Sequence, residues 1–164
     1  MSKSIRRVEA AAAAAGLAIE VRRMGESTRT AAEAAAQCGC AVAEIVKSLI
    51  FAGGESGRLM LFLVPGDRRL DEAKAVTIAG ETLQRADPRK VRDETGFAIG
   101  GVSPLGYETP IPVFADRALL DHAVVWAAAG AHDAVFAANP AELVRAAGAV
   151  LTEISENPGF ARKV

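Results

Sequence analysis

A loop rich in glycine occupies residues 100–106, with the sequence Gly-Gly-Val-Ser-Pro-Leu-Gly. Glycine has no Cβ, so several glycines in one loop let the main chain approach another body closely or adopt positive φ. Pro104 fixes part of the loop's shape. Such a loop can present backbone N–H groups to a ligand, as in an oxyanion hole. The alternative is a tight structural connection, because the loop lies between an expected apolar strand at 97–99 and a second strand-like run.

Other residues accompany this loop. Lys47 stands where an expected short helix, residues 41–47, runs into an expected strand, residues 48–52. Further along the chain, Gly130 lies in an expected turn, and an Asn-Pro pair at 139–140 begins an expected helix.

A lysine, a Gly-Gly-x-Ser-Pro-x-Gly loop, a late glycine and an Asn-Pro pair, in this order, resemble the YbaK family. That family comprises free-standing relatives of the editing domain inserted in bacterial prolyl-tRNA synthetases. The resemblance runs from about residue 28 to residue 154. It implies an editing hydrolase that cleaves the ester between a tRNA and a wrongly attached amino acid. Such a second sieve is needed because a synthetase pocket cannot strongly reject amino acids that are smaller or nearly isosteric.

The resemblance also implies which residues form the site. The glycine loop would cradle the ester, and one N–H donor aimed at the carbonyl oxygen would lower the barrier by about 3 kcal/mol. Water or a substrate hydroxyl would be the nucleophile, in keeping with a sequence that has no Gly-x-Ser-x-Gly elbow. No metal or other cofactor is implied. The expected catalytic residues are Gly100, Gly101, Ser103 and His132, and the expected substrate-binding residues are Lys47, Ser48, Pro104, Gly106 and Gly130.

Two of these residues, Lys47 and His132, also have a non-functional interpretation. Lys47 would line the editing cleft and bind a terminal phosphate or the acylated adenosine, but a surface lysine whose stem covers apolar neighbours has the same sequence signature. His132 would position water or the substrate's amino group, as in relatives that remove small amino acids; the alternative is an exposed turn residue. We expect its neighbour Asp133 to be a solvated turn residue.

Residues 134–136, Ala-Val-Phe, stand where cysteine-clearing members of the family often carry an acidic residue. A less polar cleft would suit alanine, serine or threonine better than cysteine. We therefore expect a trans-editing deacylase for tRNA(Pro), or a related tRNA, mischarged with a small amino acid. Two alternatives remain: a cysteinyl-tRNA(Pro) deacylase, and a non-catalytic module that binds tRNA or a synthetase.

Composition narrows the class of protein. The chain has 164 residues and a net charge of −1, which favours one domain and argues against a non-specific nucleic-acid binder, DNA included. No apolar run is long enough to cross a bilayer, and the start lacks the pattern of a signal peptide, so a cytoplasmic protein is expected. Cys38 and Cys40 cannot supply four zinc ligands; they are either small apolar residues or a reactive pair.

The pattern of elements predicts an α+β fold, with one mixed, mostly antiparallel sheet flanked by helices in a single domain over 1–156 and a loose tail at 157–164. Helices begin at the capping residues Thr28 or Thr30, Asp71, Asp87 and Asn139. Trp126 lies inside an apolar run and is expected in the core. Expected helices are 5–15, 30–38, 41–47, one after Asp71, 88–95 and one after Pro140, and expected strands are 17–22, 48–52, 59–64, 97–99, 111–115, 123–129, 134–138 and 149–154.

Overall fold

The computed structural model describes residues 2–156, so the expected tail at 157–164 lies outside the described residues. The helices are α1 (Lys3–Ala14), α2 (Ala31–Cys38), α3 (Glu72–Ala79), α4 (Pro88–Thr95) and α5 (Pro140–Ala147), with short 3-10 turns η1 (Val42–Glu44) and η2 (Arg117–Asp121). The strands are β1 (Arg22–Arg23), β2 (Val46–Gly53), β3 (Leu59–Pro65), β4 (Leu83–Arg85), β5 (Val113–Asp116), β6 (Val125–Ala128), β7 (Ala134–Ala138) and β8 (Val150–Thr152).

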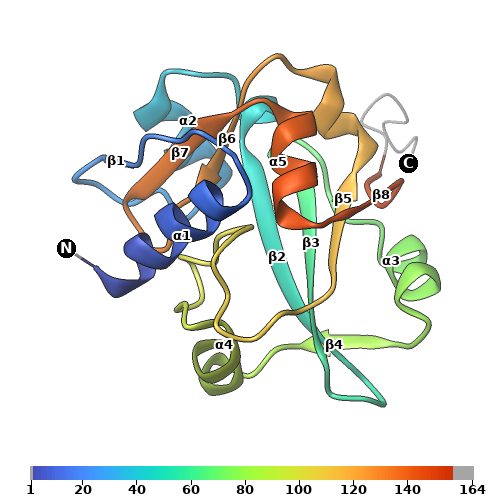
Figure 1. The fold of residues 1–164 in the computed structure, drawn as a ribbon. Coiled ribbons are helices and arrows are strands. Elements are labelled where there is room, and N and C mark those ends of the chain that lie inside the picture. The colour runs from blue at the N-terminus through green and yellow to red at the C-terminus, as the bar shows by residue number, and fades with distance from the viewer. Residues whose placement is uncertain (1, 157–164) are drawn as a thin grey trace.

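The strands divide between two sheets (Figure 1). The larger sheet has the order β4-β2-β3-β5-β8, and the smaller has the order β1-β7-β6. Strands β3, β5 and β8 pair in parallel, whereas the other pairings are antiparallel. A single bridge from Ile45 to Trp126 joins β6 of the smaller sheet to the segment that leads into β2. The prediction of an α+β fold with mixed, mostly antiparallel pairing is confirmed, although the strands form two sheets where one was expected.

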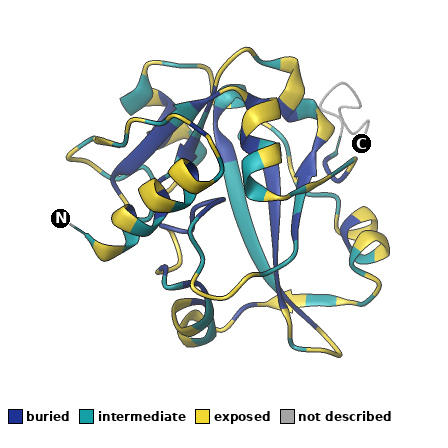
Figure 2. Ribbon diagram, viewed as in Figure 1, coloured by how far each residue is buried: buried dark blue, intermediate teal, exposed yellow. Residues whose placement is uncertain are grey.

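Strand β3 is the centre of the core (Figure 2), and every residue along it is buried. Its side chains alternate between two apolar clusters. Leu61 and Leu63 pack on one side of the sheet with residues of α1 and β7, while Phe62 and Val64 pack on the other with Ala75 of α3. A strand buried on both faces reads as an unbroken apolar run, which is how this segment appears in the sequence.

The predicted helix ends are confirmed at several positions. Thr30 caps α2 through a capping box with Glu33, and Asp71 caps α3 through the Lys74 N–H. Asn139 accepts hydrogen bonds from two N–H groups in the first turn of α5. Within residues 2–156, no helix is long and apolar enough to cross a lipid bilayer.

Several element boundaries differ from those expected. The strand expected at 17–22 is reduced to β1, and 97–99 is not a strand, because Leu17 and Phe97 bury their side chains from loops packed in the main core. The helix expected at 41–47 ends at residue 44, so Lys47 lies within a strand. Strand β4 was not predicted, because its Gln84 and Arg85 are exposed and carry no apolar pattern.

Helix α1 packs against two loops, one at Gly106 and the other at Gly130. A Cβ at Gly106 would lie 2.9 Å from the Arg7 carbonyl carbon, and a Cβ at Gly130 would lie 2.9 Å from the Ser4 carbonyl carbon. Both glycines have positive φ, at +87° and +97°. The side chain of Arg7 adds hydrogen bonds to the carbonyl oxygens of Gly106 at 3.2 Å and Gly96 at 2.7 Å. These contacts join α1 to the end of the glycine loop at Gly106 and, at Gly96, to the segment that precedes the loop.

Candidate functional site

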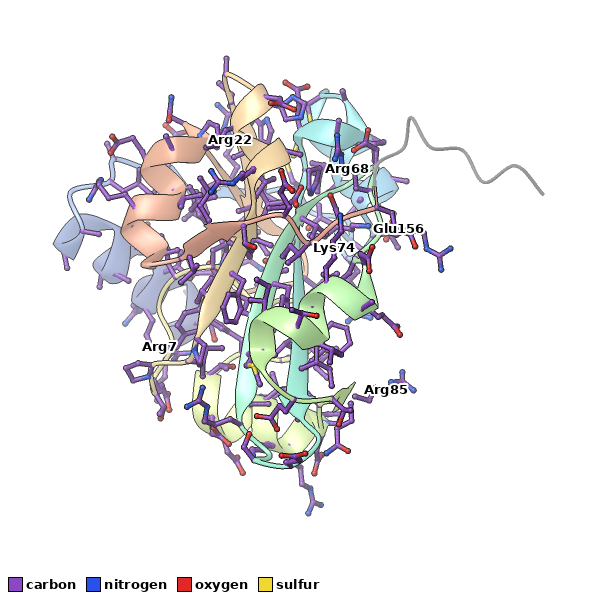
Figure 3. The ribbon with its side chains drawn as sticks, turned by 90° about the vertical axis from the view of Figure 1, so that its right-hand side faces the viewer. Arg7, Arg22, Arg68, Lys74, Arg85 and Glu156 are labelled. Carbon is purple, nitrogen blue, oxygen red and sulfur yellow. The ribbon has the colours of Figure 1, made fainter. Side chains whose placement is uncertain are left out.

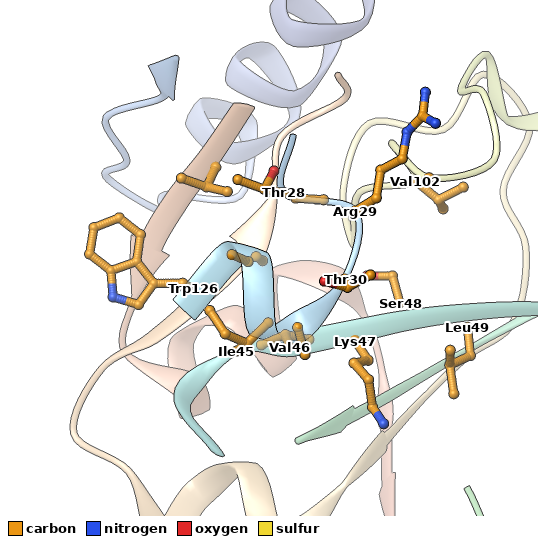
Figure 4. A pocket seen from close by; sticks show the side chains of 16 residues that line it. Thr28, Arg29, Thr30, Ile45, Val46, Lys47, Ser48, Leu49, Val102 and Trp126 are labelled. Carbon is orange, nitrogen blue, oxygen red and sulfur yellow. The ribbon is translucent and has the colours of Figure 1, made fainter. Parts of the chain in front are cut away.

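A pocket of about 320 Å³ opens between β2, the first turn of α2, the smaller sheet and the glycine loop (Figure 4). This volume is at the lower end of small-molecule sites. Most of the lining side chains are apolar, none is acidic, and Arg29 and Lys47 are the cationic residues among them. The lining residues are Thr28, Arg29, Thr30, Ala31, Ala34, Ile45, Val46, Lys47, Ser48, Leu49, Gly100, Val102, Trp126, Ala127, Ala128 and Val135.

Strand β2 sends Lys47 and Ser48 to opposite sides, because successive side chains of a strand alternate. Figure 4 shows Ser48 on the side of Thr30, and Lys47 extending the other way with Leu49. The Lys47 ammonium donates a hydrogen bond to the carbonyl oxygen of Arg68. Burial lowers the pKa of Lys47 from its usual value, with a smaller contribution from Arg69. Lys47 thus lines the pocket while its charge is turned away.

The Ser48 hydroxyl is the polar group at the pocket's inner wall. Its Oγ exposes less than 1 Å² and has no hydrogen-bond partner among residues 2–156. The neighbours around it are aliphatic: Val46 and Ile50 share its side of β2, and buried Leu63 lies opposite on β3. A buried hydroxyl without a partner is rare in proteins and calls for an explanation.

Arg29 stands at the mouth of the pocket, in the segment that leads into α2. Its side chain is exposed, and Figure 4 shows it reaching toward Val102 with the guanidinium away from β2. The stem of Arg29 lies 3.5 Å from the position that a Cβ on Gly100 would take. An arginine here presents a positive charge suited to a phosphate or carboxylate.

Trp126 is half-buried and lines the pocket instead of filling the core, which corrects the sequence-based expectation. The Arg22 guanidinium lies over its ring, with the Cζ atom 5.3 Å from the ring centroid, within the range of a cation–π contact. The indole packs beside Ala34 and Ile45, in a cluster that includes Cys38 and Cys40. Burial, followed by the neighbouring Cys40, raises the pKa of Cys38 to about 11.

Only part of the glycine loop faces the pocket. Gly100 and Val102 line it, whereas the Gly101 N–H donates to the Ala98 carbonyl at 2.9 Å within a turn. Ser103 is fully buried, and its Oγ accepts a hydrogen bond from the Leu105 N–H at 3.3 Å. Ser103 therefore holds the shape of the loop and lies outside the pocket lining.

The structure separates three expected site residues from the pocket. Pro104 is buried, and Gly106 and Gly130 lie under α1, so all three lie outside the pocket lining. His132 is exposed, and its carbonyl oxygen accepts hydrogen bonds from the N–H and Oγ1 of Thr28 at 2.7 and 2.8 Å. The backbone of His132 therefore holds the pocket segment that contains Thr28, while its imidazole is not among the lining groups.

Asp133 is buried, which corrects the expectation of a solvated turn residue. Its carboxylate accepts from the Arg23 guanidinium at 2.9 Å, and this hydrogen bond holds the pKa of Asp133 below its usual range. Arg23 is thus bound to Asp133 in the turn before β7, while the neighbouring Arg22 lies over the Trp126 ring.

The pocket coincides with the part of the chain that known proteins share. A model of the aminoacyl-tRNA editing domain family matches residues 25–146, and every lining residue falls within that range. The chain belongs to this family. Helix α1 precedes the matched residues.

Relatives connect this editing domain to prolyl-tRNA synthetase. It is 46% identical to a crystal structure of a candidate trans-editing enzyme for prolyl tRNA synthetase, with a TM-score of 0.87 over 96% of this chain and 99% of that one. It is 31% identical over 124 residues to the protein YwhH of Bacillus subtilis, covering 76% of this chain and 78% of YwhH. A proline–tRNA ligase of Bacillus licheniformis is 32% identical over 123 residues, which are 72% of this chain and 21% of the ligase. This chain is thus an aminoacyl-tRNA editing domain with sequence similarity to prolyl-tRNA synthetases.

Sequence reasoning about this editing domain missed Arg29, Thr30 and Trp126 as site residues. Arg29 and Thr30 stand at the start of the helix that the sequence predicts at 30–38. The signal that could have indicated a binding role was the charged Arg29 next to the capping residue. Trp126 carried no signal, because its place beside β2 depends on how the two sheets meet. Among residues 2–156, no three His, Cys, Asp or Glu side chains gather as metal ligands would.

The basic side chains labelled in Figure 3 do not form one surface. Figure 3 shows Arg7, Arg22 and Arg85 on separate parts of the molecule. Arg68 and Lys74 line a second hollow together with Asp71, Asp116 and other acidic residues, and the acidic residues there outnumber the basic ones. The pocket beside Arg29 is therefore the better candidate for an anionic ligand.

Proposed function

We propose that this editing domain hydrolyses the ester of tRNA(Pro), or a related tRNA, mischarged with a small amino acid. One observation carries the proposal: a small, apolar pocket without acidic residues lies beside a single exposed arginine. The polyanionic acceptor end would stay at the mouth near Arg29, and only the aminoacyl group is small enough to enter. The substrate is made in the cytoplasm, which is where the protein would act.

In the proposed reaction, water adds to the carbonyl carbon and the bond to the ribose oxygen breaks. The ribose oxygen takes a proton, and the products are the free amino acid and the tRNA. The amide that stabilises the tetrahedral intermediate would come from Gly100 or Val102, which line the pocket, since the Gly101 N–H is held by Ala98. We assign no proton transfer to Lys47 or His132.

Apolar walls support a small substrate. Val135 contributes to the lining, while Ala134 beside it is fully buried in the core. A cysteinyl ester would find no charged partner among the lining residues on the inner wall. We therefore place cysteine below alanine, serine and threonine.

A panel of tRNAs charged with alanine, serine, threonine, cysteine and proline tests the function. We expect release of one or more of the first three amino acids and little release of proline. Gly100→Ala should lower the rate about 100-fold or more if this part of the loop supplies the amide. Gly148→Ala is the matched control, because Gly148 also has positive φ but lies at the end of α5, away from the pocket. Rates must be compared at equal folded fraction.

Two results would contradict the proposal. Failure to release any amino acid, with tRNA still bound, would favour a non-catalytic binding module. A clear preference for cysteinyl-tRNA(Pro) would favour the cysteine-clearing alternative.

A further inference from the structure

The Ser48 hydroxyl is the feature of the pocket that the proposed hydrolysis does not use. Its oxygen is buried, faces the cavity from β2 and has no partner among the described residues. Leaving a buried hydroxyl unpaired costs free energy, so such a group marks a place where a bound molecule completes the hydrogen bond.

The position of Ser48 shows which part of a substrate would meet it. Arg29 and Thr30 are exposed at the mouth, whereas Val46, Val102 and Ala127 are buried. Ser48 as a whole is half-buried, but its Oγ is as buried as these side chains. In the proposed binding mode the nucleotide stays at the mouth beside Arg29, so the group that reaches Ser48 is the end of the amino-acid side chain.

Ser48 is the polar side chain available to a ligand at the inner wall of the pocket. Thr30, which Figure 4 shows on the same side of β2 as Ser48, already accepts a hydrogen bond from the Glu33 N–H at 3.1 Å. The other walls near Ser48 are aliphatic. A substrate without a hydrogen-bonding group would leave the serine unpaired, and one with a hydroxyl would pair it.

We infer that Ser48 is a specificity-determining residue that selects a β-hydroxy amino acid, with serine as the smallest fit. The inference rests on the proposed function, because it takes the pocket's occupant to be the aminoacyl group. Ser48 contributes one donor and two acceptor lone pairs, so it pairs with a substrate hydroxyl in either direction. A site built to hydrogen-bond a hydroxyl rejects the analogue that lacks it more strongly than an apolar pocket rejects one methylene.

The test compares seryl- and alanyl-tRNA(Pro) with the wild type, Ser48→Ala, Ser48→Thr and Ser56→Ala. The control, Ser56, lies in the exposed β2–β3 turn, where it bonds Glu81. We expect kcat/KM to favour the seryl ester by about tenfold or more in the wild type and in Ser56→Ala. Ser48→Ala should abolish this preference by slowing the seryl ester alone. Ser48→Thr retains the hydroxyl and should keep the preference.

A binding measurement separates this inference from the proposed hydrolysis. The probes are 3′-seryl and 3′-alanyl amides of 3′-amino-3′-deoxyadenosine, which cannot be hydrolysed as esters, titrated by calorimetry. Tighter binding of the seryl amide, lost in Ser48→Ala, would support the inference even if no ester were cleaved, and in that case the proposed function alone would fail.

Three results would overturn the inference: equal affinity of the wild type for the two amides, no binding of either, or an equal loss for both in Ser48→Ala. The last would mean that Ser48 contacts a group that all aminoacyl adenosines share. Stability separates folding from recognition, because deleting an unpaired buried hydroxyl should leave the melting temperature unchanged or raise it.

Discussion

Lys47 and Ser48 are adjacent in the sequence, but strand alternation gives them opposite surroundings. The serine hydroxyl is buried at the pocket wall with no partner in the described part of the chain, and the lysine ammonium is bound to a carbonyl oxygen on the other side of β2. The family resemblance pointed to the lysine as the binding residue. The structure adds that its charge reaches a ligand only by leaving Arg68.

Lys47→Met tests how much the hydrogen bond from Lys47 to the Arg68 carbonyl contributes to stability. The variant keeps most of the alkyl stem and removes the donor to Arg68, so we expect a loss of about 1 kcal/mol in the free energy of unfolding. The loss is small because removing a desolvated ammonium offsets part of it. Urea unfolding measures this change.

The salt dependence of tRNA binding then shows whether the ammonium reaches a phosphate. Arg29→Met should flatten the dependence by about one unit of slope, because one phosphate contact is lost. Lys47→Met should leave the slope unchanged. If Lys47→Met flattens it as much as Arg29→Met does, Lys47 leaves Arg68 and binds the tRNA directly.

At the scale of elements, the glycine loop depends on a helix that lies outside the matched family region. Arg7 of α1 donates to the carbonyl oxygens of Gly106, at the end of the loop, and of Gly96, just before the segment that leads into it, and its guanidinium lies 5.2 Å from the Phe97 ring centroid. Gly100 and Val102, which face the pocket, lie between these two attachment points.

Arg7→Met should therefore loosen the pocket from a distance. We expect faster amide hydrogen exchange over residues 97–105 and a fall in deacylation, together with a loss of about 1–3 kcal/mol in stability. Arg6→Met is the matched control, because Arg6 is the next residue of α1 and is exposed. Equal exchange in the two variants would show that the loop holds its shape without Arg7.

Much of the fold was predictable because its signals are local. Thr30 and Asn139 begin helices at caps, and the apolar run at 59–64 could only be a buried strand. Phe97 was misplaced because an apolar residue under a helix has the same pattern as one in a strand. The site was harder, because Trp126 and Val135 reach the pocket only through the pairing of β6 and β7 next to β2.

At the scale of the whole molecule, α1 holds the smaller sheet against the larger one. Ile5, Val8 and Ala12 are buried in the same apolar cluster as β3 and β7. The contact requires Gly130, where any side chain would meet the Ser4 backbone. The position of α1 thus sets how the two sheets lie, and the pocket is the space between them.

Gly130→Ala should destabilise the whole domain by about 2 kcal/mol or more. The strain of positive φ costs about 1–2 kcal/mol, and the clash with Ser4 adds to it. Gly148→Ala separates these effects, since Gly148 has φ of +62° with nothing within 4 Å of the added Cβ. We expect Gly148→Ala to lower the free energy of unfolding only by the cost of positive φ. If urea unfolding shows similar losses of stability for Gly130→Ala and Gly148→Ala, α1 shifts to accommodate the added methyl group at no energetic cost.

The pocket is drawn from five stretches of the chain, which begin at residue 28 and end at residue 135. During synthesis on the ribosome the first helix emerges early, but the glycines that receive it, at 106 and 130, are made much later. A domain with such distant contacts completes its fold only when most of its length is available. A nascent chain that stops before β7 therefore has no enclosed cavity. The pocket is therefore completed late in synthesis, once its last lining residue, Val135, has been made.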